Sequence, residues 1–483
     1  MGVSLPISAA INPSPARTVA TSPLSGANAP SIALPLMFTM TGLLALGAGV
    51  AWLVLQPDIL ATYHYNQYVI AVTHLFVLGW ICTVVMGAMY QLVPVALETR
   101  LYSERLARWQ FAFHVVGFVG MVWMFRVWNM TQLAHFGSVF AFGVVLFVYN
   151  MARTLRRVPK WNITATAVTA ALVWLSLAIT AGLSIAAAKC DYESAMEQSP
   201  PAFVVVMLHG LQSVGGFVAH FDPMSAMHAH AHLGGVGCFT MLIVGVSYKL
   251  IPMFTLSELQ SRRRTAWSVA LLNIGLAGSF VTILRRSPLK PAFALVVVAA
   301  LAVYGWELRA ILRARKRRVL DWGIKYFLTA IMLLWPLSVL AVVLSWPGLP
   351  LNKFTGQLEN LYGFLGLIGV ITFAIIGMSY KIIPFLVWFG RYSRQIGRAR
   401  VPSLADLYSA RLQALGYWTW LAGLAATSGA IVLSSATGVR IGCGFLALGV
   451  AALALNVGRM LAHFFKPAFQ PFTLPTSTTP KTA

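Results

Sequence analysis

Charged residues are scarce in this chain. They make up 10% of its 483 positions, and only 12 residues are acidic. Hydrophobic residues make up 58%, and the mean hydropathy is +0.76. A soluble fold needs a polar surface toward water, so this composition excludes an ordinary soluble protein and predicts residence in a membrane.

Cysteine is also scarce, and its four positions, Cys82, Cys190, Cys238 and Cys443, are far apart. This spacing argues against a disulfide framework and against a CxxC metal site. The first thirty residues carry Arg17 as their one charge and lack both a basic region and a compact apolar run, so we expect a disordered tail over 1–30 rather than a signal peptide. A Pro/Thr-rich second tail is expected over 467–483, with one membrane domain over 31–466 between them.

Apolar runs of about twenty residues recur along this domain, each long enough to cross a bilayer as a helix. We therefore predict an all-α, polytopic membrane protein with about twelve transmembrane helices. The expected helices lie near 32–55, 69–96, 109–128, 131–151, 162–187, 227–253, 266–284, 291–311, 323–346, 361–388, 412–434 and 438–461.

The basic residues predict the orientation, because Lys and Arg collect in cytoplasmic loops. Loops after the even-numbered helices carry most of them, for example Arg262 to Arg264, whereas the opposite loops carry few apart from Arg285, Arg286 and Lys290. We expect a multi-pass protein of the bacterial cytoplasmic (inner) membrane with both termini in the cytoplasm. The charges are scattered over short loops, so the expected contact is the lipid bilayer with its anionic headgroups, and no nucleic acid.

One pattern occurs three times, on the predicted helices 2, 6 and 10. It begins at His74, His232 and Phe364 and keeps the same spacing to two glycines, a tyrosine and a proline. The members are Gly79, Gly87, Tyr90 and Pro94; Gly237, Gly245, Tyr248 and Pro252; and Gly369, Gly377, Tyr380 and Pro384. This predicts three pseudo-symmetric four-helix arcs over about 31–160, 161–320 and 321–466. We expect the glycines to serve close helix packing more than the approach of a flat ligand, and the tyrosines to anchor the membrane interface.

A histidine at this position on helices 2 and 6 of a twelve-helix chain resembles subunit I of the heme–copper oxidases. The cbb-type oxidases and the nitric oxide reductases are the most similar members. The resemblance implies that His74 matches the axial ligand of a low-spin heme and that His232 matches the helix 6 ligand of copper.

The chain departs from this family at other ligand positions. The helix 10 histidine pair falls at Tyr362 and Phe364, and predicted helix 7 contains no histidine. The chain also has few ionisable residues from which a proton path through the membrane could be built. Glu307 is the clearest acidic residue inside a predicted helix, and Arg309 is a candidate ion-pair partner for it. If the chain is an enzyme, the resemblance implies an oxidoreductase, but not a standard oxygen-reducing oxidase.

The remaining histidines gather at the extracytoplasmic end of helix 6, where His228, His230 and His232 follow Met224 and Met227. Imidazole and thioether groups bind copper, and imidazole is the usual axial ligand of heme. We expect a heme held by His74 and either His230 or His232, and a copper site at His228, His232, Met224 and Met227. Packing or a wet helix end remains the alternative for these residues, while His64, His114, His135 and His463 are expected to be structural.

Three functions stay open at this point. The first is a divergent oxidase-like protein that binds heme or copper near its extracytoplasmic face and acts in electron transfer or nitric oxide handling, with a redox partner subunit or cytochrome. The second is a metal or small-solute transporter. The third is a scaffold that has kept the oxidase fold without its cofactors.

Overall fold

A computed structural model of the chain describes residues 31–190, 202–468 and 470–471. The expected tail over 1–30 and most of the one over 467–483 lie outside these residues. The first repeat holds α1 (Ala33–Leu55), α2 (Asp58–Ala61), α3 (Gln67–His74), π-helix η1 (Leu75–Cys82), α4 (Thr83–Ala96), α5 (Glu104–Val127) and α6 (Met130–Leu155).

The second repeat holds α7 (Ile163–Ala187), α9 (Ala202–Val218), α10 (Pro223–His232), π-helix η2 (Leu233–Thr240), α11 (Met241–Thr255), α12 (Arg262–Leu284) and α13 (Lys290–Arg313). The third holds α14 (Trp322–Ser345), α15 (Lys353–Phe364), π-helix η3 (Leu365–Ile371), α16 (Thr372–Tyr392), α17 (Ala410–Val432) and α18 (Ala436–Phe465). The short 3₁₀ helices η4 (Ser393–Gln395) and η5 (Leu404–Leu407) and strand β1 (Ala399–Arg400) lie between α16 and α17, and β1 pairs antiparallel with β2 (Gln470–Pro471).

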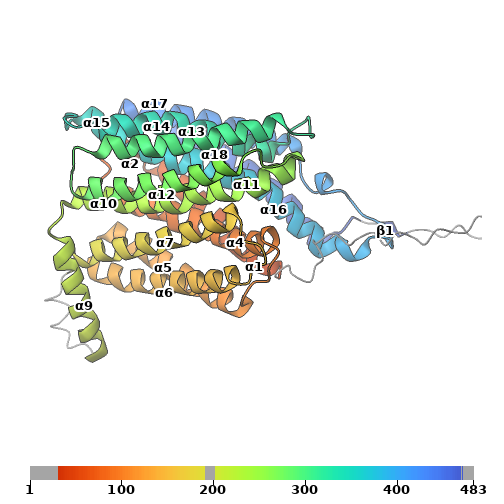
Figure 1. Cartoon of the computed structure of the whole chain (residues 1–483), viewed down its shortest axis with the longest axis horizontal. Helices are drawn as coiled ribbons and strands as arrows, with labels where there is room; N and C mark the ends of the chain where they lie inside the picture. The colour runs from red at the N-terminus through yellow and green to blue at the C-terminus, as the bar shows by residue number, and fades with distance from the viewer. Residues whose placement is uncertain (1–30, 191–201, 469, 472–483) are drawn as a thin grey trace, which may run out of the picture.

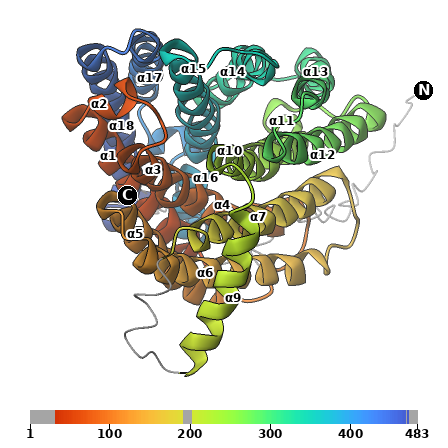
Figure 2. The same ribbon diagram turned by 90° about the vertical axis from the view of Figure 1, so that its left-hand side faces the viewer.

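The long helices run side by side along one axis, which confirms the all-α prediction (Figure 1). The expected helices are present, several of them longer than predicted; helix 10, expected from 361, begins at Lys353. Helix α9, which the sequence analysis did not predict, lies across one end of the bundle (Figure 1). Viewed along the axis, α3, α10 and α16 lie in the middle and the other long helices surround them (Figure 2).

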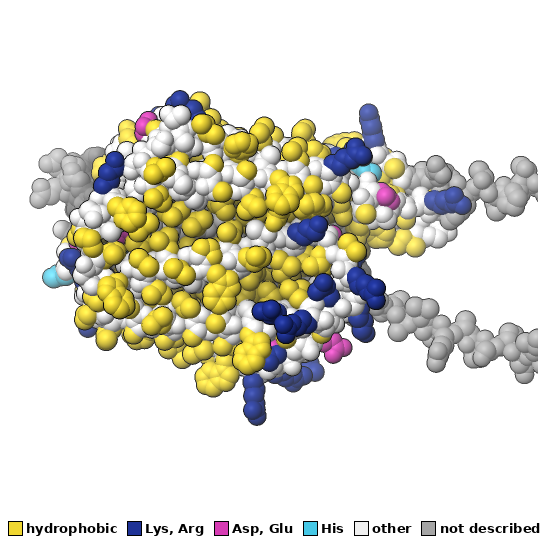
Figure 3. Space-filling model, turned by 90° about the horizontal axis from the view of Figure 1, so that it is seen from above, with side chains coloured by type: hydrophobic (Ala, Val, Ile, Leu, Met, Phe, Trp, Pro, Cys, Tyr) yellow, Lys and Arg dark blue, Asp and Glu magenta, His cyan; other side chains and the backbone are white. Residues whose placement is uncertain are grey.

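Among the described residues, eleven helices are long and apolar enough to span a membrane. The twelfth long helix of the pattern, α17, has 23 residues and packs along α18. Apolar side chains cover the side of the bundle, and Lys and Arg gather toward one end (Figure 3). Such a belt with charged ends is what a lipid-exposed surface requires. We call the end formed by the loops before α5, α12 and α17 the basic end, and the opposite one the histidine end.

The repeat is structural as well as sequential. Directly after His74, His232 and Phe364 the backbone changes from α to π, at η1, η2 and η3. Near each π segment's end a threonine hydroxyl donates to the carbonyl five residues earlier: Thr83 to Leu78, Thr240 to Gly235 and Thr372 to Leu367, at 2.8 to 2.9 Å. A π segment frequently marks a functional site, and here it shifts the register of the helix next to each repeat's first position.

A second threefold feature lies at the basic end. Helices α5, α12 and α17 are N-capped by Ser103, Ser261 and Ser409. The backbone N–H of each serine donates to a buried side chain 46 or 47 residues later, namely Asn150, Glu307 and Asn456. The same hydrogen bond therefore joins two helices in each of the three arcs. Glu307 occupies the position at which the other two arcs have asparagine.

The repeat tyrosines lie inside the protein, so the expectation that they anchor the membrane interface was wrong. Tyr90, Tyr248 and Tyr380 are at most 3% exposed. Tyr90 donates to Gln110 Oε1 at 3.3 Å, and the hydroxyls of Tyr248 and Ser268 are 2.6 Å apart. A buried phenol needs such a partner, which a neighbouring helix of the same repeat supplies to Tyr90 and to Tyr248.

The repeat glycines permit close packing, as expected, most clearly at the second glycine. A Cβ on Gly377 would lie 2.6 Å from Gly323 O and 2.9 Å from Phe327 N, both backbone atoms of α14. Backbone cannot move aside as a flexible side chain can, so we expect Gly377→Ala to destabilise the protein by about 1–3 kcal/mol. Thermal unfolding of purified protein measures this.

Gly458→Ala is the matched control, because a Cβ there meets no atom within 4 Å and the glycine is exposed on α18. That variant should be as stable as the wild type or more stable by about 0.5–1 kcal/mol. Equal stability of the two variants would contradict the assigned packing.

Candidate functional site

The histidines of helices 2 and 6 lie at the histidine end, where α3 and α10 approach the centre of the bundle (Figure 2). His74 is the last residue of α3, and its Nδ1 donates to Ile70 O at 2.8 Å. The ring lies against Phe125 of α5, with centroids 4.3 Å apart. This hydrogen bond fixes the proton on Nδ1 and leaves the lone pair of Nε2 available.

His230 is held in the same way by a different helix. Its Nδ1 donates to Ala178 O of α7 at 2.9 Å, so its Nε2 is again the nitrogen with an available lone pair. His230 is near enough to His74 for a charge on one imidazole to act on the other. Two neighbouring repeats therefore each present one half-buried imidazole in the tautomer that binds a metal.

His232 is engaged with Tyr362 of helix α15. Its Nδ1 donates to His228 O at 2.8 Å, and its Nε2 lies 3.3 Å from the Tyr362 hydroxyl. The two rings stack with centroids 5.8 Å apart and planes at 22°. Tyr362 stands at a helix 10 position where the resembled family has a heme ligand, and its direct contact with His232 leaves no place between them for a heme iron and a copper ion.

Glycines leave space around these histidines. A Cβ added at Gly234, Gly235 or Gly363 would meet no atom within 4 Å. Gly182 of α7 does the opposite, because a Cβ there would lie 2.8 Å from Cε1 of His230 and displace the ring. Two imidazoles with available Nε2 atoms in an apolar bundle have the chemistry of the axial ligands of a heme. The residues present therefore fit a heme at His74 and His230 better than at His74 and His232.

The residues expected to bind copper contact different partners in the structure. The sulfur of Met224 accepts from the Tyr63 hydroxyl at 3.7 Å, and Met227 is half-buried on α10. His228 faces His64, with their Nε2 atoms 3.1 Å apart, rather than sharing an ion with His232. The grouping of Met224, Met227, His228 and His232 around one ion stays a prediction.

His64, which was expected to be structural, also lies in this region, although it is isolated in the chain. Its neighbour Glu359 comes from α15, with an oxygen 3.6 Å from His64 Nδ1. Burial lowers the pKa of His64 to about 4, so its imidazole is neutral at neutral pH. Nothing in the local sequence signals this contact, because His64 and Glu359 are separated by almost 300 positions.

The other histidines expected to be structural have protein partners. His114 is fully buried, and its Nε2 lies 2.8 Å from the Thr83 hydroxyl and 3.2 Å from Leu78 O. His463 Nδ1 lies 2.7 Å from the hydroxyl of Tyr392, and His135 Nδ1 lies 3.4 Å from Gln132 Oε1. These contacts explain the three residues without a ligand.

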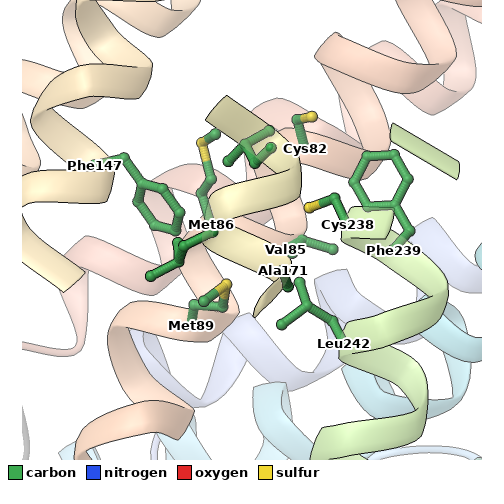
Figure 4. A pocket seen from close by; sticks show the side chains of 11 residues that line it. Cys82, Val85, Met86, Met89, Phe147, Ala171, Cys238, Phe239 and Leu242 are labelled. Atoms are coloured by element: carbon green, nitrogen blue, oxygen red, sulfur yellow. The ribbon is translucent and has the colours of Figure 1, made fainter. Parts of the chain in front are cut away.

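A small apolar cavity lies between the first and second repeats, deeper in the bundle than the histidines. Its volume is about 10 Å³, and it is lined by Cys82, Val85, Met86, Met89, Phe147, Ala171, Leu172, Leu175, Cys238, Phe239 and Leu242 (Figure 4). Cys82 and Cys238, which are isolated in the sequence, both line it as free thiols (Figure 4). Walls of carbon and sulfur alone offer water no hydrogen bonds, so such a cavity suits a small apolar molecule.

Glu307 does not lie on a path toward the histidines. It is fully buried at the basic end, where its Oε1 accepts from the N–H groups of Gln260 and Ser261 and its Oε2 pairs with Arg264 Nε at 2.7 Å. The suggested partner Arg309 was wrong; the ion pair is made by Arg264. Glu307 is a capping group of α12, because its lone pairs satisfy the start of that helix.

Comparison with known proteins agrees with the fold and with the first repeat. The family model described as cytochrome c and quinol oxidase polypeptide I matches residues 18–134. No curated protein matches the chain. Among 45 matching chains of solved structures is one from a cryo-EM structure of a heme–copper terminal oxidase dimer, with 12% identity, a TM-score of 0.59, and coverage of 89% of this chain and 84% of that chain.

These similarities confirm the resemblance that the repeat suggested. The match in sequence covers α1 to α5, and the match in fold covers most of the chain. The chain is thus a multi-pass membrane protein that is similar to subunit I of the heme–copper oxidases, in fold over most of its length and in sequence over residues 18–134.

Proposed function

We propose that this protein is a membrane redox protein that binds one heme between its first and second repeats, with His74 and His230 as axial ligands. The proposal rests mainly on the hydrogen bonds of the two imidazoles, which give both rings the same tautomer. Each holds its Nδ1 proton on a backbone carbonyl, and each keeps Nε2 available. A backbone hydrogen bond of this kind orients a ligating histidine and raises its basicity.

The surrounding residues support a low-spin, electron-transferring role. A heme with two axial histidines supplies one-electron transfer when it is bound. Phe125 packs on His74 and fixes its ring, while Gly182 gives His230 room against α7. The hydrogen bond between His232 and Tyr362 keeps that imidazole engaged with protein, so substrate reduction of the oxidase type is not expected at this position.

Electron transfer coupled to nitric oxide handling is the role we favour. The cavity lined by Cys82, Met86, Met89 and Cys238 has room for about one molecule of the size of a diatomic gas, and its lining offers no polar group to an ion. The positive-inside rule assigns the basic end to the cytoplasm, so the heme would lie near the extracytoplasmic face of a bacterial inner membrane. A redox partner subunit or cytochrome would then approach the histidine end.

Transport receives less support from the described residues of helix 6. A solute path would need polar groups facing a channel, but Thr240, Ser247 and Tyr248 each bond to protein atoms. A copper site involving Met224 and His228 remains compatible with the proposal, because neither residue is needed for the heme.

A reduced-minus-oxidised optical spectrum with metal analysis on the purified protein tests the proposal. We expect about one heme per chain with the narrow visible bands of a low-spin center. Copper without heme would shift the site to α10, and a well-folded sample with neither cofactor would make the scaffold function the better account.

A further inference from the structure

Three side chains of the metal-binding type meet at the histidine end, and none of them is one of the proposed heme ligands His74 and His230. They are His64 before α3, His228 on α10 and Glu359 on α15. One ligand atom from each can be chosen so that all three lie within 4.8 Å of one another. Each repeat contributes one of them, so the cluster lies where the three arcs meet.

His64 lies between the other two residues and is close to both. Its Nε2 is 3.1 Å from His228 Nε2, and its Nδ1 is 3.6 Å from Glu359 Oε2. The Nδ1 atom is buried and has no hydrogen-bond partner within the described part of the chain. A buried nitrogen without a partner costs free energy unless a ligand satisfies it.

Hydrogen bonds between repeats hold the loop of His64 in place. Asn360 donates to Thr62 O at 2.6 Å, and Gln357 donates to Ala61 O at 2.9 Å, which ties the loop to the helix that carries Glu359. Asn66 caps α3 and donates back to Tyr63 O at 2.7 Å. The loop is therefore positioned by contacts that do not use the three candidate ligands.

The other two residues follow well-defined helix starts. Asp222 caps α10 through the N–H of Ser225, a hydrogen bond that lowers the pKa of its carboxyl, and His228 comes six residues later. Asn352 and Thr355 form a capping box at the start of α15, and Glu359 comes seven residues after Asn352. Ligands carried on capped helices are held precisely enough to form a preorganised site.

Charges of both signs lie near the cluster, because Asp222 acts on His228 with a sign opposite to that of Lys290. The histidine end has an exceptional basic group at Arg285, Arg286 and Lys290, and Lys290 is near enough to act on Glu359 and His228. Among the described residues the Glu359 carboxylate has its ion-pair contact with His64 and none with Lys290, so Lys290 does not occupy the carboxylate. The side chains of His64 and Glu359 are 12% and 28% exposed, which leaves the cluster reachable from the end of the bundle.

We propose that His64, His228 and Glu359 bind one divalent first-row metal ion, with Zn²⁺ as the ion best matched to the ligands. Two imidazoles and one carboxylate, with water in a fourth position, are a recurring zinc ligand set. The 3.6 Å between His64 Nδ1 and Glu359 Oε2 is close to the roughly 3.3 Å that separates two ligand atoms of a tetrahedral zinc ion with bonds of roughly 2.0 Å. The ion shares no ligand with the heme at His74 and His230, so the two proposals stand or fall separately.

Binding would join the three repeats. The ligands come from three separate arcs and meet only in the folded protein, so the ion stabilises the native state and raises its unfolding temperature. It would also lie one helical turn from His232 and Tyr362, because His232 Nδ1 donates to the carbonyl of His228. The proposed ion would therefore cross-link the three repeats at the histidine end of the bundle.

The test is equilibrium dialysis of the purified full-length protein against Zn²⁺, followed by metal analysis and thermal unfolding. We expect about one ion per chain and a rise in unfolding temperature for the wild type. His64→Ala and Glu359→Gln should each weaken binding by at least about 100-fold, since loss of a partner that only orients a ligand already costs about 10–100-fold. Glu359→Gln keeps the shape of the side chain and so tests the charge alone.

His135→Ala is the matched control, because His135 is an exposed histidine at the start of α6, at the same end of the bundle. It should bind Zn²⁺ as the wild type does. Heme content should be unchanged in Glu359→Gln, so loss of zinc with heme retained separates this site from the proposed function. A wild type that binds no Zn²⁺, or a Glu359→Gln variant that binds and is stabilised as the wild type is, would overturn the proposal.

Discussion

Replacing His74 by alanine will abolish the low-spin heme spectrum of the purified protein, and His230→Ala will do the same. Each substitution removes one of the two nitrogens that the fold presents with a free lone pair, and one axial ligand cannot keep the iron low-spin by itself. Optical spectra of the oxidised and reduced variants, normalised to protein, measure the effect. The elution volume of each variant should match the wild type, which shows that the fold is retained.

His232→Ala is the variant that makes this experiment decisive. His232 lies on the same helix as His230 and matches a copper ligand in the family, but its two nitrogens contact His228 O and Tyr362. Its loss should leave the heme spectrum intact. If His232→Ala loses the heme while His230→Ala keeps it, the ligand assignment is wrong, and an unchanged spectrum in His74→Ala would remove the heme site altogether.

Replacing Glu307 by alanine will destabilise the protein by about 3–5 kcal/mol. The substitution leaves Arg264 without its partner and the N–H groups of Gln260 and Ser261 without an acceptor at a buried position. Glu307→Gln should cost clearly less, because an amide oxygen can still accept from Ser261, as Asn150 and Asn456 accept from Ser103 and Ser409. Unfolding temperatures in the same detergent compare the variants.

Glu258→Ala serves as the control, since Glu258 is an exposed acidic residue in the loop just before Gln260. Its unfolding temperature should equal that of the wild type. Should Glu307→Ala also unfold at the wild-type temperature, the capping role would be refuted and a role in proton movement would become the better explanation.

Most of the fold could be predicted from local sequence. Apolar runs of bilayer length specify helices because the backbone must be hydrogen-bonded within one segment. The repeat at His74, His232 and Phe364 predicted three arcs, and the structure adds that a π-helix follows each of these positions. The predicted interface role of Tyr90, Tyr248 and Tyr380 failed because position along a helix does not say which side faces lipid.

The sequence predicted the candidate heme ligands of the site but not the atoms that their side chains contact. His74 and His230 could be proposed as ligands because imidazole is unusual inside a membrane helix and has few uses there. The choice of His230 over His232 needed the carbonyl of Ala178 and the hydroxyl of Tyr362, which come from other helices. A single sequence gives the chemistry of each side chain but not the atoms opposite it.

By itself the sequence determined the membrane class, the helices and the threefold repeat, because these depend on hydropathy and spacing along one segment. Tertiary structure alone decided that Glu307 caps α12, that Cys82 and Cys238 share a cavity, and that His64 and Glu359 meet His228. Those contacts join residues dozens to hundreds of positions apart. They depend on how the arcs pack around the centre, which no local pattern records.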